Sequence, residues 1–142
     1  MSVPEANIPE VRIDETTRPY WSALAEGRLM RQHCRACGHD WLPPRPNCAA
    51  CLADDCEWRD CSGHGRIVSW VVYHKAYAPH LADRVPYNVA IVELAEGPRL
   101  LTNIIDSPDG RGLAPGAAVE LAIEEDFGRA LPRFRLAPAP DA

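Results

Sequence analysis

Four cysteines in two pairs constrain this chain more than any other feature of its sequence. The pairs are Cys34-Arg-Ala-Cys37 and Cys48-Ala-Ala-Cys51, and ten residues separate them. A Cys-x-x-Cys turn places two sulfur atoms on one side of a metal ion, and a second such turn completes a tetrahedron with bonds of about 2.3 Å. The spacing therefore predicts a ribbon that binds one zinc ion. Four protein ligands leave no open coordination position, so we expect this zinc to be structural.

Other interpretations of the cysteines stay open in the sequence. The chain begins Met1-Ser-Val-Pro-Glu-Ala, without the basic and apolar segments of a secretory signal. We therefore expect a cytoplasmic protein, where thiols stay reduced and two disulfides are disfavoured. Iron accepts the same four thiolates, which makes a rubredoxin-like electron carrier an alternative. Cys56 and Cys61 are additional thiols and alternative ligands.

Composition excludes several classes of protein. The chain has 142 residues, of which 46% are hydrophobic, so it can form one ordinary domain or two small ones. No apolar run approaches the roughly 18 residues of a membrane span, so we expect no membrane partner. The formal net charge of −5 lacks the basic signature of a nucleic-acid binder, so no nucleic-acid partner is expected. A single-stranded nucleic-acid module is kept as an alternative; it would need a basic groove with stacking aromatic residues.

The chain divides into three predicted parts: an N-terminal arm and helix over residues 1–27, the zinc ribbon over 28–61, and a β domain over 62–142. The segment 18–27 predicts a short helix, because Trp21, Leu24 and Ala25 share one face and Gly27 is a typical stop. Arg28–His33 and Glu57–Cys61 predict strands that enter and leave the ribbon, and we expect Trp41 to pack over the metal site.

The β domain carries five short runs with the composition of strands. Their number and spacing predict a five-stranded OB-fold barrel. The fold class is therefore mainly β, with a short N-terminal helix and a rubredoxin-like four-cysteine zinc ribbon before the barrel. The predicted strands cover residues 66–77, 87–94, 99–105, 119–124 and 131–136.

The order of these segments resembles the DUF35 family, which is described as an acyl-CoA-associated zinc ribbon fused to an OB-fold. The resemblance covers the chain from Arg18 to Leu136 and lies in the order and spacing of its pieces. The sequence departs from the family pattern at Leu52, which follows Cys51 where a glycine is usual, and in the extra thiols of Cys56 and Cys61. The matching pieces are Arg18–Trp21, Leu29–Gly38, Leu42–Pro46, Trp58, Ser62–Trp70, Pro86–Leu94 and Leu131–Phe134.

The resemblance implies an accessory subunit. Family members are usually found with thiolase-like enzymes, which include thiolases, thiolase-fold aldolases and hydroxymethylglutaryl-CoA synthases, and some pair with MaoC-type enoyl-CoA hydratases. Their implied role is to complete the partner's acyl-CoA site or to pass acyl-CoA between active sites, in lipid or steroid metabolism. We therefore expect a hetero-oligomer with a thiolase-fold or MaoC-type subunit, with acyl-CoA as a further ligand.

The residues themselves predict no active site in this chain, because no histidine is placed beside a nucleophilic cysteine or serine. Three regions are candidates for contact with a partner or with acyl-CoA. They are the helix, the loop from Tyr77 to Tyr87, and the arginines in and before the ribbon, which only Asp40 opposes in the sequence. The predicted contact residues are Tyr20, Trp21, Arg31, Arg35, Tyr77, His80, Arg84 and Tyr87.

Overall fold

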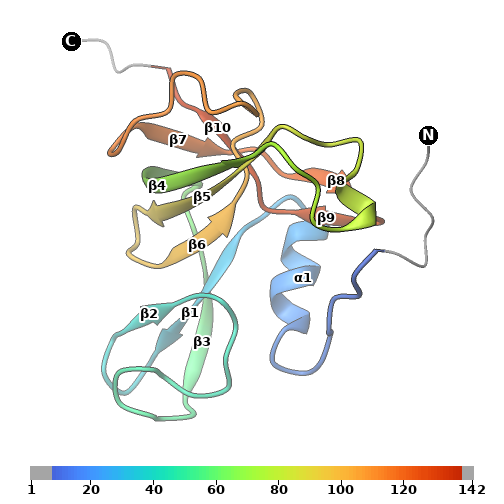
Figure 1. Ribbon diagram of the computed structural model, residues 1–142. Coiled ribbons are helices and arrows are strands. Elements are labelled where there is room, and N and C mark those ends of the chain that lie inside the picture. Colours follow the sequence, from blue (N-terminus) through green and yellow to red (C-terminus); the bar gives the residue numbers. More distant parts are fainter. Residues whose placement is uncertain (1–7, 139–142) are drawn as a thin grey trace.

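The computed structural model describes residues 8–138, which form a short helix, a small three-stranded sheet and a larger β barrel (Figure 1). Helix α1 covers Arg18–Ala25 and has a proline in its first turn, where no N–H group is needed. Just before it, the Asp14 carboxylate accepts hydrogen bonds from the backbone N–H groups of Thr16 and Thr17. Gly27, with a φ of 85°, follows the helix and allows the chain to turn away.

The buried face of α1 differs from the predicted one. Tyr20, Ala23 and Leu24 are buried, whereas Ala25 is exposed and Trp21 is half-buried. The helix packs against β1 and β9, and this contact rotates the buried stripe by one position. Trp21 lies at the flank of the helix, where the Arg129 guanidinium stacks over its ring at 5.0 Å.

The ribbon is an antiparallel sheet in the order β2-β1-β3. Its strands are β1 (Met30–Cys34), β2 (Asp40–Trp41) and β3 (Cys56–Asp60). Gln32, buried in the central strand, holds the connecting loop: its Nε2 donates to the Arg45 carbonyl at 2.8 Å, and its Oε1 accepts from the Arg45 N–H at 2.7 Å. Trp41 packs against the buried sulfurs of Cys34 and Cys48, which confirms its predicted position.

Five strands form the barrel in the order β10-β7-β4-β5-β6. A parallel bridge between Ile104 and Phe134 joins the chain after β6 to β10 and closes the sheet. Closure through the third and fifth strands, with the first and fourth side by side, is the OB-fold arrangement and confirms the predicted fold class. The strands are β4 (His64–Tyr73), β5 (Tyr87–Leu94), β6 (Arg99–Thr102), β7 (Ala118–Leu121) and β10 (Phe134–Leu136).

The predicted strands over residues 119–124 and 131–136 are shorter in the structure, because a hairpin that the sequence patterns did not predict lies between them. This hairpin pairs β8 (Glu124–Asp126) with β9 (Arg129–Leu131), between the fourth and fifth barrel strands. Pro132 has no N–H group to continue a ladder, so β9 ends before it and β10 starts after it. The hairpin and the loop after β4, which holds a short 3-10 turn at Pro79–Leu81, lie at the same end of the barrel (Figure 1).

One apolar core connects the helix, the ribbon and the barrel. Phe134, Ile67 and Val92 form its barrel part, and Leu24 and Leu29 extend it toward the helix and β1. All five side chains are at most 1% exposed. The small ribbon therefore gains part of its stability from burial against the barrel, in addition to any bound metal.

Candidate metal centre and contact surfaces

The four paired cysteines converge on one point. Their Sγ atoms all lie within 4.8 Å of one another, and those of Cys34–Cys51 and of Cys37–Cys48 are 3.6 Å apart. Zinc–sulfur bonds of about 2.3 Å in a tetrahedron place the sulfurs about 3.8 Å apart. The same separations are far longer than a disulfide bond of about 2.05 Å. The four residues therefore fit a tetrahedral metal such as zinc.

Backbone N–H groups support thiolate character at Cys48. The Ala50 N–H group points at Cys48 Sγ at 3.3 Å. Burial raises the pKa of the Cys48 thiol, but hydrogen bonds from the N–H groups of Cys51 and Ala50 and from the side chains of Cys37 and Cys51 bring the pKa to about 7. A thiolate is the form that binds metal, so the fold prepares Cys48 for this role.

The remaining two cysteines lie outside the cluster. Cys56 pairs with Cys34 across β3 and β1, and Gln32 Nε2 lies 3.5 Å from its sulfur. Burial raises the pKa of the Cys61 thiol to about 11, and the nearby Arg31 opposes the effect only in part. Among residues 8–138, the metal-ligand geometry is met by the four paired cysteines and by no other group of three or more such side chains.

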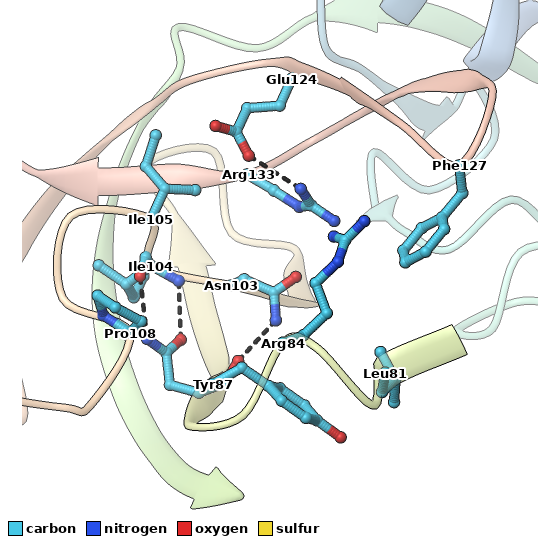
Figure 2. A pocket seen from close by; sticks show the side chains of 11 residues that line it. Leu81, Arg84, Tyr87, Asn103, Ile104, Ile105, Pro108, Glu124, Phe127 and Arg133 are labelled. Atoms are coloured by element: carbon cyan, nitrogen blue, oxygen red, sulfur yellow. Dashed lines mark hydrogen bonds and ion pairs between the residues drawn. The ribbon is translucent and has the colours of Figure 1, made fainter. Parts of the chain in front are cut away.

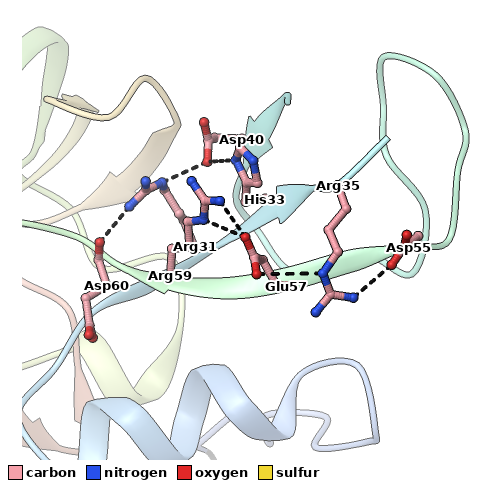
Figure 3. A network of polar contacts seen from close by, with 8 residues as sticks. All are labelled: Arg31, His33, Arg35, Asp40, Asp55, Glu57, Arg59 and Asp60. Atoms are coloured by element: carbon pink, nitrogen blue, oxygen red, sulfur yellow. Dashed lines mark hydrogen bonds and ion pairs between the residues drawn. The ribbon is translucent and has the colours of Figure 1, made fainter. Parts of the chain in front are cut away.

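The predicted contact arginines of the ribbon are engaged in ion pairs (Figure 3). Arg31 Nε lies 2.9 Å from Asp40 Oδ1, and Arg31 is only 12% exposed. Arg35 bonds Asp55 at 2.8 Å and lies 3.6 Å from Glu57. The expectation that only Asp40 opposes these arginines is therefore wrong, because antiparallel pairing brings the acids preceding and within β3 beside β1.

The loop after β4 presents a cluster of tyrosines. Tyr77 is 72% exposed, and its ring meets Tyr73 edge-on at 6.0 Å. Tyr87, which begins β5, stacks on Tyr73 at 5.1 Å and is half-buried. Tyr73 was not among the predicted contact residues. The sequence did place it near the end of a predicted strand that is rich in aromatic and β-branched residues. Tyr20, in contrast, belongs mainly to the core, and burial raises its pKa.

A cleft of about 250 Å³ lies among this loop, the β8–β9 hairpin and the segment after β6 (Figure 2). Arg84 from the loop makes a bidentate ion pair with Asp126 from the hairpin, with one of its bonds at 2.9 Å. Arg133 Nη1 lies 2.8 Å from the same carboxylate and 2.9 Å from Glu124. The cleft therefore has a polar wall of two guanidinium groups and the Glu124 carboxylate, and Asp126 pairs with both guanidinium groups from outside the lining.

Phe127 forms the tip of the hairpin in an unusual conformation. Its φ is 52° and that of Gly128 is 80°, as in a two-residue type I′ turn, where the first position usually holds asparagine, aspartate or glycine. The ring is held by the Arg84 guanidinium at 4.4 Å and by the ring of His80 at 5.3 Å. A phenylalanine kept in the left-handed region is strained, and such strain is concentrated at functional sites. The sequence signal for this hairpin turn was the glycine that directly follows Phe127.

The ion pairs of Asp126 give a pH-dependent prediction. Hydrogen bonds from Arg84, opposed by burial and supported by hydrogen bonds from Arg133, lower the pKa of Asp126 to about 2. Because the folded-state pKa is depressed, the stabilisation is present above the ordinary value near 3.8 and is lost as the pH falls through about 2. We expect Asp126→Asn to lower the free energy of unfolding at pH 7 by about 1–2 kcal/mol, measured by urea denaturation.

The matched control is Asp109→Asn, an acid whose arginine neighbour is 89% exposed, and it should change little. The deficit of Asp126→Asn should shrink between pH 4 and pH 2, where the carboxylate becomes protonated in the unfolded chain while it stays ionised in the folded one until about pH 2. A deficit that stays constant over this range would contradict the assignment.

The fold and the four-sulfur site together define a protein with a rubredoxin-like zinc ribbon followed by an OB-fold. Two family models agree: the zinc ribbon domain of ChsH2 matches residues 21–57, and the C-terminal OB-fold domain of ChsH2 matches residues 58–124. A DUF35 domain-containing scaffold protein of Methanothermobacter thermautotrophicus is 33% identical over 78% of this chain and 83% of its own length. The chain belongs to the DUF35 family.

Two further relatives are more similar in sequence. A probable enoyl-CoA hydratase alpha subunit of Thermomonospora curvata is 36% identical over 93% of this chain, but the chain spans only 41% of that protein. A solved chain described as Ltp2-ChsH2(DUF35) aldolase is 36% identical, with a TM-score of 0.77, and covers 89% of this chain and 98% of its own length. A DUF35 protein of Sulfolobus solfataricus, at 14% identity and a TM-score of 0.64, shares the fold. Within residues 8–138, no helix is long and apolar enough to cross a membrane.

Proposed function

We propose that this chain is a non-catalytic accessory subunit of an acyl-CoA-processing enzyme, with zinc as a structural ion bound by Cys34, Cys37, Cys48 and Cys51. The partner is a thiolase-like enzyme, such as a thiolase-fold aldolase, or a MaoC-type hydratase. Acyl-CoA binds at the surface that the two proteins form together. The observation that carries the proposal is the similarity along most of the chain to a chain of the Ltp2-ChsH2(DUF35) aldolase.

The side chains support a role without catalysis. The sulfur cluster uses all four ligands of a tetrahedral ion, so a bound zinc would stabilise the ribbon and have no position for substrate. Among the described residues, no histidine side chain hydrogen-bonds a serine or cysteine side chain; His33, for example, contacts Asp40 at 2.9 Å. A nucleophile with its base is therefore not assembled in this part of the chain.

The proposal is tested by isolating the chain from its native cells under mild conditions and identifying the protein that co-purifies in constant ratio. A thiolase-fold or MaoC-type subunit is expected. An assembly that contains only this chain, or one with a protein of another class, would contradict it. The assembly should also be rebuilt from the two purified proteins, so that variants of this chain can be compared in the complex.

Tyr77 is a proposed anchor of the interface. An aromatic side chain that is 72% exposed in the isolated chain gains most of its burial only in a complex. We expect Tyr77→Ala to weaken association by more than ~1 kcal/mol, measured by titration calorimetry with the enzyme subunit. The melting temperature and zinc content of the isolated chain should not change.

Tyr73→Ala serves as the comparison, because Tyr73 packs between the rings of Tyr77 and Tyr87. It should lower the melting temperature of the isolated chain, which Tyr77→Ala should not. Normal association of the Tyr77 variant would show that this loop is only a connection between β4 and β5.

A further inference from the structure

Three adjoining hollows form a continuous furrow beside β6. The cleft of Figure 2 shares Asn103 and Arg133 with a hollow of about 430 Å³, which in turn shares Tyr20, Pro43 and Leu101 with a third of about 530 Å³. We call this the β6 furrow. It begins at the polar wall of the hairpin and ends against the apolar residues of β6 and of the loop after β2.

The backbone pairing of β6 leaves part of its edge open toward the furrow. The Leu94 N–H group donates to the Pro98 carbonyl at 2.8 Å, and hydrogen-bonded pairs alternate along an antiparallel ladder. With Val92 opposite Leu100, the backbone groups of Leu100 face β5, and those of Arg99 and Leu101 face away from it. Between residues 8 and 138, no hydrogen bond engages these outward groups.

The same edge is already used one step further along the chain. The Phe134 N–H group donates to the Asn103 carbonyl at 3.1 Å, and the Ile105 N–H group donates to the Phe134 carbonyl at 2.9 Å. Barrel closure therefore pairs the outward backbone groups of Asn103 and Ile105 with Phe134. It does not extend back along the chain to the outward groups of Leu101. The open stretch is a continuation of a ladder that the protein itself has begun.

Protection against pairing is confined to the start of this edge, at Pro98 and Arg99, and does not extend to Leu101. Exposed edges usually carry lysine, proline or a bulge, but β6 reads Arg99-Leu-Leu-Thr102 and Leu101 is 70% exposed. Leu42 and Pro43 form the opposite wall, so the furrow is apolar at this end. An open, apolar strand edge of this kind is typical of a surface that another chain covers.

A buried donor indicates what the furrow accepts. Among the described residues, the charged side chains that line the three hollows are Arg12, Arg84, Arg99, Arg133 and Glu124, and each of the four arginines lies within ion-pair distance of an acid. In the whole chain acids outnumber bases, with 20 Asp and Glu against 15 Lys and Arg. Arg133 also has a buried Nε–H group with no partner among residues 8–138, and such a donor requires an acceptor oxygen.

We propose that the β6 furrow seats an extended segment of the enzyme subunit, which adds to the open edge of β6 as a further strand. The segment is apolar where it faces Leu101 and Pro43, and it brings a carboxylate or carbonyl oxygen to Arg133 Nε. An acyl chain in the same place would dehydrate the backbone groups of Arg99 and Leu101 without pairing them, which is unfavourable. A polypeptide pairs with them. This proposal rests on the proposed function.

Hydrogen exchange tests the pairing residue by residue. The isotope-labelled chain is exposed to deuterated water alone and in the rebuilt complex. Exchange is then quenched, the chain is separated from the enzyme subunit, and the remaining amide protons are measured by NMR. The Arg99 and Leu101 amides should exchange freely in the isolated chain and become at least about tenfold slower in the complex. The Leu100 and Thr102 amides should be protected in both states, so that the change follows every second residue.

Leu101→Pro tests the same contact by substitution. It removes only the outward N–H group, so the ladder to β5 stays intact, and proline is tolerated on an edge strand. We expect about tenfold or greater loss of affinity for the enzyme subunit. Leu101→Thr keeps the N–H group, so its loss of affinity for the enzyme subunit should be smaller. Val71→Thr changes an exposed position on β4 outside the furrow, so the affinity should not change.

The outcomes separate the possibilities. A complex that forms without protection of Arg99 and Leu101 overturns the furrow proposal and leaves the proposed function in place. Protection that grows with the concentration of this chain alone indicates a second copy and overturns it, and so does protection by decanoyl-CoA without the enzyme. If no enzyme subunit associates, both proposals fail. If Leu101→Pro does not fold, the exchange pattern of the unsubstituted chain decides alone.

Discussion

Cys37→Ser and Cys48→Ser are each expected to abolish metal binding and to unfold the ribbon. Residues 28–61 are too few to bury a core of their own, and zinc binding contributes roughly 10–16 kcal/mol in small zinc peptides. Elemental analysis should find about one zinc per unsubstituted chain and almost none in either variant. The protein should be colourless, because iron bound to four thiolates, as in an electron carrier, is coloured.

The matched variants are Cys56→Ser and Cys61→Ser, which replace the same side chain outside the four-sulfur cluster. Both should retain the metal. Loss of zinc from the Cys56 variant would show that the ligand set is wrong. Cys56 is the stricter comparison, since it faces Cys34 across the ribbon.

Asn88→Ala should destabilise the barrel more than Asp126→Asn does. Asn88 is 1% exposed, and its side chain makes three hydrogen bonds to backbone: it donates to the carbonyls of Ile104 at 2.9 Å and Ser107 at 2.7 Å, and it accepts from the Ile104 N–H at 2.8 Å. Alanine leaves these buried groups unpaired, so we expect a loss of about 3 kcal/mol or more in the free energy of unfolding. Urea denaturation measures it.

Asn47→Ala provides the comparison, because Asn47 is exposed and donates one side-chain bond, to the Leu52 carbonyl at 3.1 Å. Its cost should stay below about 1 kcal/mol. Similar losses for the two variants would show that Asn88 does not hold the segment after β6 in place.

Local patterns in the sequence were sufficient for the metal site and for most strands. The two Cys-x-x-Cys pairs determine their own geometry through short turns, and β5 has the predicted bounds because its alternation is regular from Tyr87 to Leu94. The end of β6 was missed because a distant side chain decides it: Asn88 takes the Ile104 N–H group that a longer strand would use.

The contact surface was harder to predict, because its residues meet only after folding. Arg84 and Asp126 are 42 positions apart, and no local pattern pairs them. The ribbon arginines looked opposed by Asp40 alone, because the acids preceding and within β3 reach them only through the antiparallel register. The Tyr77–Tyr87 loop was predicted as a contact surface because no strand period explains its aromatic residues, and its contact role stays a prediction. The open edge of β6 depends on which backbone groups face inward, which a sequence does not specify.

Acyl-CoA turnover by this chain alone, by its enzyme subunit alone and by the two together is the most direct test of the proposed role. Thiolase, aldolase and hydratase assays with a series of acyl-CoA esters should show no turnover by the isolated chain, and the complex should be more active than the enzyme subunit by itself. Saturable turnover by the isolated chain, abolished by one point substitution within it, would show that the chain is an enzyme and not an accessory subunit.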